Sequence, residues 1–282
     1  YALESDVMNA HQKATIGNAL IKKTMALYYN EPKDFEELVY KGLVLQGMGI
    51  RRGIEAHRRN RPFCMGTLYW QLNDSWPVVS WSGIDYYGNW KALHYQTRRA
   101  YAPILLNAIK EDNQLGIYVM SDKLEAYPGA TLQLQLSDFN GKTLKKWKVG
   151  NDVPANTSIR FHQEDYATLA TDPTRTFLLM TLKSKDGKEL SKEIFYFNYP
   201  KDQNLPQTDI RYKIKQEDGR CEVTLQSKQL ARDVFIEIPY QGARFSDNFF
   251  DLLPGETRKI TITSPQIRKA EPVSLKIRHL EF

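Results

Sequence analysis

The hydrophobic pattern of this 282-residue chain changes character once, at Ala102-Pro103. Before this point, apolar residues recur at helical spacing from Asp6 to about Tyr29 and from Asp34 to about His57. After it, apolar and polar residues alternate in short runs separated by turn signals, as in strands that bury one face. The two patterns occupy different parts of the chain, so we expect a multidomain α+β protein.

The first third of the chain predicts a strand and a long loop between helices. The helix that begins at Asp34 should be capped by that carboxylate, while Glu37 reaches back as in a capping box. The run Cys64–Leu72 predicts a buried strand, residues 74–89 a structured loop, and residues 90–101 a third helix. This order is typical of the last β/α unit of a (β/α)8 (TIM) barrel, with the active site at the strand's C-terminal end.

Two immunoglobulin-like β-sandwich domains are expected after the barrel unit. Asn140-Gly141 and Asp186-Gly187 predict hairpin turns within the first sandwich, which should have about seven strands. A polar linker at Pro200–Pro206 precedes the second sandwich, in which Asp218-Gly219 predicts another turn. The expected domains are 1–102 for the C-terminal part of a catalytic (β/α)8 barrel, 103–200 for the first sandwich and 201–282 for the C-terminal sandwich.

Composition and residue spacing argue against a nucleic-acid partner, a membrane span, a metal site and a cofactor. The net charge is +6, but Lys and Arg are spread through all regions, so we expect no nucleic-acid partner. No apolar run is long enough for a membrane span. Cys64 and Cys221 lie far apart and the His residues are isolated, so we expect no disulfide, metal site or cofactor. The first residues have no initiator Met or signal pattern, and upstream domains of the same chain are therefore expected partners.

Four of the five tryptophans fall in one short segment. They are Trp70, Trp76, Trp81 and Trp90. Proteins recognise sugars by stacking them on aromatic rings while short polar side chains bond the hydroxyls, and Asn73, Asp74 and Ser75 lie among these rings. A loop that packs its tryptophans for stability would have the same composition, so composition leaves both interpretations open.

Six motifs along the chain are informative when they are taken together. They are Glu55–Pro62, Gly66–Pro77, Ser80–Ser82, Asp85–Gly88, Trp90–Ala92 and Ser246–Glu256. These motifs resemble the β-mannosidases of glycoside hydrolase family 2, in which Gly66–Pro77 would form the eighth barrel strand and the start of its loop. The resemblance covers essentially the whole chain.

The resemblance implies a retaining exo-β-mannosidase that hydrolyses terminal non-reducing β-D-mannose residues. Such enzymes use two carboxyl groups about 5–5.5 Å apart. Both glutamates lie on earlier barrel strands in the family, so no catalytic residue is expected here and the isolated chain should be inactive. The implied partner is a β-mannoside oligosaccharide or glycoside. The family also suggests a periplasmic or secreted location.

The predicted substrate-binding residues are Trp70, Asn73 and Asp74. Strand alternation places Trp70 on the same face as Leu68 and nearer the barrel mouth, and in the family the Trp at this position lines the subsite of the cleaved mannose. Asn73 and Asp74 are candidates for bonding hydroxyls, whereas Asp85 is expected to form a turn. The other tryptophans of the cluster, Trp76, Trp81 and Trp90, are expected to pack.

A second hypothesis is a carbohydrate-binding or structural β-sandwich module of another family 2 glycosidase, of the β-galactosidase or exo-glucosaminidase type. That function would require a row of exposed aromatic side chains on a sandwich. Beyond Trp90 the chain has a single tryptophan, Trp147. The sequence therefore favours the mannosidase.

Overall fold

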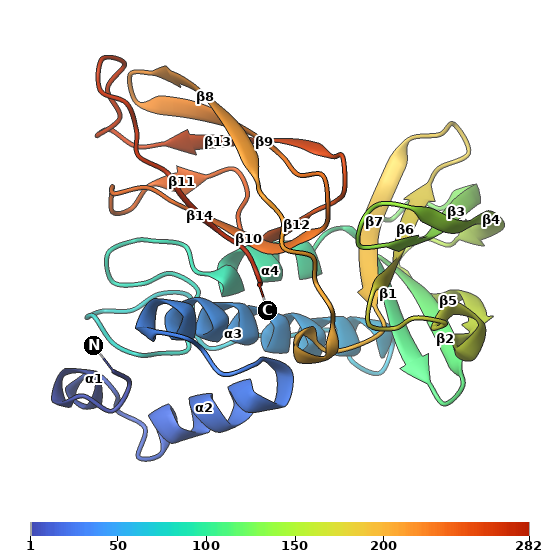
Figure 1. The fold of residues 1–282 in the computed structure, drawn as a ribbon. Coiled ribbons are helices and arrows are strands. Elements are labelled where there is room, and N and C mark those ends of the chain that lie inside the picture. The colour runs from blue at the N-terminus through green and yellow to red at the C-terminus, as the bar shows by residue number, and fades with distance from the viewer. Residues whose placement is uncertain (1, 282) are drawn as a thin grey trace. The chain divides into compact units, whose positions relative to one another are not determined.

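The computed structural model describes residues 2–281 and divides them into two compact units. The first unit comprises residues 2–50, 69–97 and 205–281, and the second comprises residues 51–68 and 98–204. Helices α3 (Phe35–Arg59) and α4 (Ala92–Ala100) contribute residues to both. Figure 1 shows the order of the elements along the chain.

The first predicted helix is interrupted. The structure has α1 (Asp6–Ala10) and α2 (Gly17–Tyr28), with an irregular link between them. His11, the first residue of this link, accepts a backbone hydrogen bond from Val79 at 3.0 Å through its carbonyl. The prediction of one continuous helix was wrong. The contact that holds the link comes from Val79, which lies far along the sequence and which no local pattern indicates.

The start of α3 confirms the predicted capping. The Glu37 backbone N–H donates to Asp34 Oδ1 at 2.8 Å. The Glu37 carboxylate reaches back one residue further than expected, because it accepts from the Lys33 N–H at 2.6 Å. Glu37 also pairs with Lys41 at 2.9 Å, one helical turn on. The local sequence therefore determines where this helix begins.

The predicted strand at Cys64–Leu72 is not part of a sheet. The segment is extended, and Leu68, expected to fill a barrel layer, is 99% exposed. A barrel strand is bonded to a neighbour on each side, whereas the described residues before β1 (Ile104–Glu111) are helices, turns and irregular segments that offer none. The prediction of a buried strand was wrong for this structure, and no barrel is evident in it.

The sandwich of the second unit consists of two antiparallel sheets. One has the order β1, β2 (Gln114–Ser121), β5 (Thr157–Asp165), and the other has the order β4 (Thr143–Val153), β3 (Tyr127–Asp138), β6 (Thr176–Lys183), β7 (Glu189–Tyr196). The short helix α5 (Tyr166–Leu169) follows β5. The two predicted hairpin turns connect β3 to β4 and β6 to β7, with Gly141 and Gly187 at positive φ.

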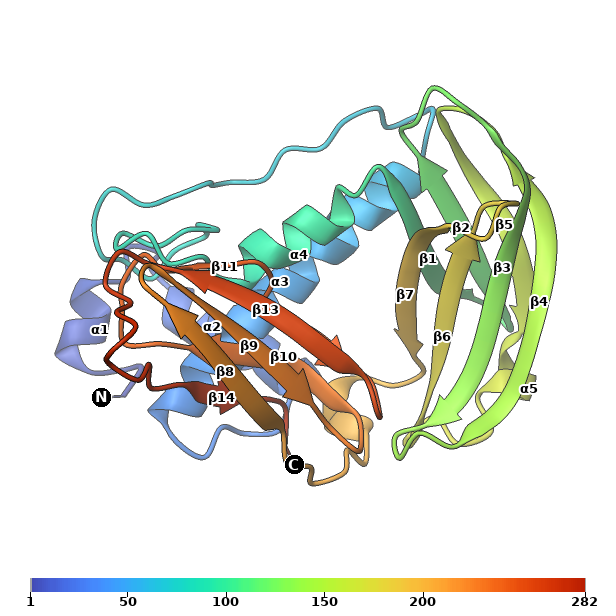
Figure 2. The same cartoon turned by 90° about the horizontal axis from the view of Figure 1, so that it is seen from above.

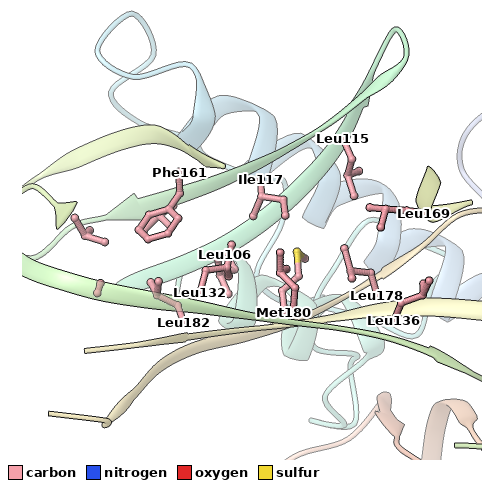
Figure 3. Close-up of a cluster of buried hydrophobic side chains, with 14 of the residues drawn as sticks. Leu106, Leu115, Ile117, Leu132, Leu136, Phe161, Leu169, Leu178, Met180 and Leu182 are labelled. Carbon is pink, nitrogen blue, oxygen red and sulfur yellow. The ribbon is translucent and has the colours of Figure 1, made fainter. Parts of the chain in front are cut away.

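The inner faces of these sheets form one apolar core, drawn in Figure 3. Ile117 and Phe161 point from one sheet toward Leu132 and Met180 of the other (Figure 3). The buried residues alternate with less buried ones along β3, as the period of two predicted. The apolar residues that alternate along these strands are therefore buried within this sandwich.

The C-terminal sandwich belongs to the first unit. Its sheets have the orders β11 (Arg244–Phe245), β13 (Thr257–Thr263), β9 (Arg220–Gln226), β8 (Arg211–Glu217) and β12 (Phe250–Leu252), β10 (Ala231–Glu237), β14 (Lys276–Arg278). Figure 2 shows β8, β9 and β13 side by side. The predicted turn Asp218-Gly219 joins β8 to β9. A short 3-10 helix (Pro200–Asp202) begins the predicted linker.

Helices of the first unit pack against its sandwich. The Tyr40 hydroxyl donates to the Asp233 carbonyl at 2.8 Å, and the Tyr95 ring lies 6.1 Å from that of Phe249. Both tyrosines are buried. The aromatic segment that precedes α4 is therefore part of the same packed unit as the C-terminal strands.

Two further features concern membrane spans and cysteines. No helix within residues 2–281 is both long enough and apolar enough to cross a bilayer. Cys64 and Cys221 are free thiols, and burial raises the pKa of the Cys221 thiol.

Candidate functional site

The candidate site is the aromatic segment, residues 69–90, in the first unit. A parallel bridge pairs Asn73 with Ile84, and an antiparallel bridge pairs Ile84 with Trp90. The Ile84 N–H donates to the Leu72 carbonyl at 2.9 Å, and the Lys91 N–H donates to the Gly83 carbonyl at 2.9 Å. The segment is therefore folded back on itself and joined to the start of α4.

Trp70 lies three residues before Asn73, the first residue of this pairing. Its side chain is 71% exposed, and the peptide bond to Gln71 is cis. Among the described residues, none forms a ring contact or hydrogen bond with the indole. The indole face is thus open to a ligand, in a segment that has no sheet neighbours in this chain.

Asn73 and Asp74 are adjacent in sequence but differ in environment. The Asn73 side chain is exposed. In the described part of the chain its side-chain amide group has no hydrogen-bond partner, so this group is free to contact a ligand. Asp74 is buried. The structure thus brings Asn73 to the surface with Trp70 and turns Asp74 inward.

The Asp74 carboxylate holds the loop together. It accepts from Ser80 Oγ at 2.8 and 2.7 Å, from Ser82 Oγ, and from Gln71 Nε2 at 3.1 Å. Hydrogen bonds to an ionised acceptor are stronger than those between neutral groups, particularly when they are buried. Asp74 therefore fixes the two ends of the loop from residue 71 to residue 82.

Lys91 adds a second tie to the same loop. Its Nζ donates to the Ser80 carbonyl at 3.3 Å, and the same carbonyl accepts from Gln46 Nε2 at 3.4 Å. Burial lowers the pKa of the Lys91 ammonium, while the carboxylates of Asp74 and Asp85 act in the opposite direction. The effect of burial is the larger one, so the two carboxylates offset only part of it.

The remaining tryptophans of the cluster differ in environment. Trp90 packs as expected, with its ring 4.2 Å from that of His94 and 5.7 Å from that of Tyr95. Trp76 is 37% exposed and stacks on His11 at 5.4 Å. Trp81 is 60% exposed, so the expectation that it packs was wrong.

Asp85 forms the predicted turn. Its carboxylate accepts from the Asn89 backbone N–H at 2.8 Å and from Asn89 Nδ2 at 2.9 Å. The turn is also held from the C-terminal sandwich, because the Gly242 N–H donates to Asn89 Oδ1 at 2.9 Å and Arg244 donates to the Gly88 carbonyl at 2.5 Å. Gly88 and Gly242 both have positive φ.

Sequence reasoning missed several residues that shape this site. His11 and Arg244 are far from the cluster in sequence, and nothing local indicates their contacts with Trp76 and Trp90. The Ser80-Trp81-Ser82 alternation was a usable signal, because two small polar residues that face inward leave the residue between them facing outward.

The side-chain positions support neither an exposed aromatic row on the first sandwich nor a metal site. Trp147 is partly buried against the core of its sandwich, with Nε1 donating to Glu164 Oε1 at 2.7 Å, so it does not begin an exposed aromatic row. Within residues 2–281, no three His, Cys, Asp or Glu side chains gather in a group that could hold a metal ion.

Comparison with protein families matches both sandwiches. Residues 113–202 match the family described as a mannosidase Ig/CBM-like domain, and residues 205–281 match one described as an Ig-fold domain. These matches account for the two sandwiches of the fold. They establish that both are immunoglobulin-like.

Curated relatives extend the similarity over most of the chain. A β-mannosidase of Capra hircus is 26% identical over 92% of this chain and 32% of its own length. β-Mannosidase A of Aspergillus terreus is 29% identical over 70% of this chain and 23% of its own length. The chain thus spans about a third or less of these relatives.

Solved structures agree with the sequence relatives. The β-D-mannosidase of Dictyoglomus thermophilum superposes with a TM-score of 0.84 and 28% identity, covering 99% of this chain and 34% of that one. The exo-chitosanase of Amycolatopsis orientalis, at 19% identity, covers 93% of this chain and 36% of its own with a TM-score of 0.68, which shows the fold alone. The chain therefore fits the C-terminal portion of a β-mannosidase of glycoside hydrolase family 2.

Proposed function

We propose that this chain is the C-terminal part of a retaining exo-β-mannosidase that removes terminal non-reducing β-D-mannose residues from oligosaccharides or glycosides. The observation that carries the proposal is the similarity, over 92% of the chain, to a protein named β-mannosidase. The open indole of Trp70 supports it, because a sugar ring stacks on such a face.

The proposed organisation is 1–102 for the C-terminal part of the catalytic barrel, 103–200 for the first sandwich and 201–282 for the second. The exposure of Phe63 (89%) and of Leu68 supports the first assignment. Apolar side chains of an extended segment are covered when strands lie on both sides of it, as in a closed barrel. Upstream parts of the same protein would supply those strands.

In this proposal Trp70 stacks on the mannose that is cleaved, and Asn73 bonds one of its hydroxyls. Asp74 contributes by holding the loop on which Asn73 lies. We assign no catalytic residue to this chain. The acid/base and nucleophilic carboxyls of a retaining mechanism would come from upstream barrel strands, so the chain alone should not hydrolyse p-nitrophenyl β-mannoside.

The test is Trp70→Ala in the full-length protein. Loss of a stacking ring should reduce kcat/KM on p-nitrophenyl β-mannoside by more than tenfold, within the roughly five- to 150-fold range that corresponds to about 1–3 kcal/mol. Trp147→Ala should leave kcat/KM nearly unchanged. Circular dichroism and melting must show that both variants remain folded.

Two outcomes would contradict the proposal. Near-normal kcat/KM in folded Trp70→Ala would remove Trp70 from the site. A wild-type protein that hydrolyses β-glucosaminides or β-galactosides but no β-mannoside would assign the chain to another specificity of the family.

A further inference from the structure

We propose that Trp81 is a second sugar platform, which binds a pyranose ring of an oligosaccharide next to the mannose that is cleaved. This inference rests on the proposed function and deepens it, because it makes oligosaccharides, rather than simple glycosides, the preferred substrate class.

The Trp81 side chain lies in an open environment. At 60% exposure it is the second most exposed tryptophan after Trp70. The described part of the chain offers its indole no ring, cation or hydrogen-bond partner. Trp90, in contrast, is partly buried and contacts His94 and Tyr95. The open ring of Trp81 therefore exposes apolar surface that a sugar ring can cover.

Trp81 points outward because of its neighbours. Ser80 and Ser82, on either side, direct their hydroxyls inward to the Asp74 carboxylate. With both flanking side chains turned to Asp74, the Trp81 side chain points away from it and into solvent. The exposure of Trp81 is thus imposed by a buried acid and does not come from a loose loop.

Trp81 and Trp70 belong to two segments that meet at the Asp74 carboxylate. This carboxylate accepts from Gln71, the residue after Trp70, and from Ser80 and Ser82, the residues on either side of Trp81. The Gly83 N–H also donates to the Gln71 carbonyl at 3.0 Å. The two exposed indoles are therefore presented from neighbouring segments of one loop.

A ligand that stacks on Trp81 meets a backbone that is already held in place. The Ser80 carbonyl is held by Lys91 and Gln46, so the backbone beside Trp81 is ordered before any ligand arrives. A ring on a pre-ordered backbone loses little conformational entropy when it stacks on a ligand. Stacking requires only an apolar pyranose face, which suits a neutral hexose of the substrate chain.

The experiment compares two substrates of the full-length protein. Methyl β-D-mannopyranoside has no second sugar ring, whereas a β-linked mannotriose has two more, and released mannose reports both reactions. Trp81→Ala should lower kcat/KM on mannotriose by about five- to 150-fold and change it less than about twofold on the methyl glycoside. Trp81→Phe, which keeps a ring, should retain most of the activity on mannotriose. Trp70→Ala should impair both substrates.

Each outcome separates the two proposals. Equal losses on both substrates in a folded Trp81→Ala variant, or no loss on either, would overturn the Trp81 platform and leave the proposed function standing. A wild-type protein that is inactive on both mannosides would overturn the proposed function together with the platform.

Discussion

The sandwich of the second unit and the aromatic segment of the first unit are both rich in large apolar side chains, but they use them in opposite ways. In the sandwich, residues such as Leu132, Leu134 and Met180 are completely buried between two sheets. In the aromatic segment, Trp70 and Trp81 face solvent. The first region buries its apolar surface, which stabilises the sandwich, and the second leaves part of its apolar surface exposed.

The difference shows what holds each region in place. The sandwich is stabilised by removal of apolar area from water. The aromatic segment is held by directional polar bonds, several to the carboxylates of Asp74 and Asp85 and one from the Lys91 ammonium, beside the ring contacts of Trp76 and Trp90. Directional bonds fix a backbone without covering its side chains, which is what a binding loop requires.

One substitution, made in each region of the 282-residue chain by itself, tests this difference. Leu134→Ala removes a buried side chain and should cost about 2–5 kcal/mol in the free energy of unfolding. Leu72→Ala, at a position in the aromatic segment that is 57% exposed, should stay within about 0.5 kcal/mol. Urea unfolding of the two variants measures both costs. Similar costs would show that the Leu72 side chain is buried in the folded chain and that the two regions do not differ.

A second prediction concerns the polar anchor. Asp74→Ala leaves the hydroxyls of Ser80 and Ser82 without their acceptor and should destabilise the loop by about 1–3 kcal/mol. Hydrogen exchange of the amides of residues 71–84 should become faster, and the fluorescence anisotropy of the tryptophans should fall.

Asp209→Ala is the matched control. Asp209 is exposed and belongs to the same unit, so its removal should change stability by no more than about 0.5 kcal/mol. Unchanged exchange in Asp74→Ala would mean that apolar packing holds the loop after all.

A weak pH dependence of stability is expected from the start of α3. Burial alone would raise the pKa of the Glu37 carboxyl, but the Lys33 N–H and the Lys41 ammonium lower it below the ordinary 4.5. A lowered pKa in the folded state means that the contribution of Glu37 is present above pH 4.5 and is lost as the pH falls through the folded-state pKa.

Glu37→Gln should therefore destabilise the protein by about 0.2–1 kcal/mol at pH 7, since solvent screens this pair, and by less at pH 3. The cost of Leu134→Ala should be the same at both pH values, because no charge is involved. A Glu37 effect that grew on acidification would contradict the assigned direction.

The sequence predicted most where structure is local. The hairpin turns at Asn140-Gly141 and Asp186-Gly187, the cap at Asp34 and the turn at Asp85 depend on residues within a few positions of each other. The period of two along β3 likewise predicted which side chains are buried. Nearest-neighbour geometry suffices for such features.

Prediction failed where a distant partner decides the outcome. A continuous first helix was expected, but His11 is bonded to Val79, which no local pattern indicates. The strand at Cys64–Leu72 was expected because its residues are apolar, yet a strand exists only where another strand pairs with it.

The sequence alone was therefore sufficient to predict the helices of the first part, the sandwich cores and the aromatic segment that resembles a family of glycosidases. It did not predict that Asp74 turns inward to bond two serines or that Arg244 of the C-terminal sandwich contacts Trp90. Periodicity indicates which side chains of a helix or strand face a core. Which group satisfies a buried charge, and which ring stays open, depends on contacts between residues far apart in the chain.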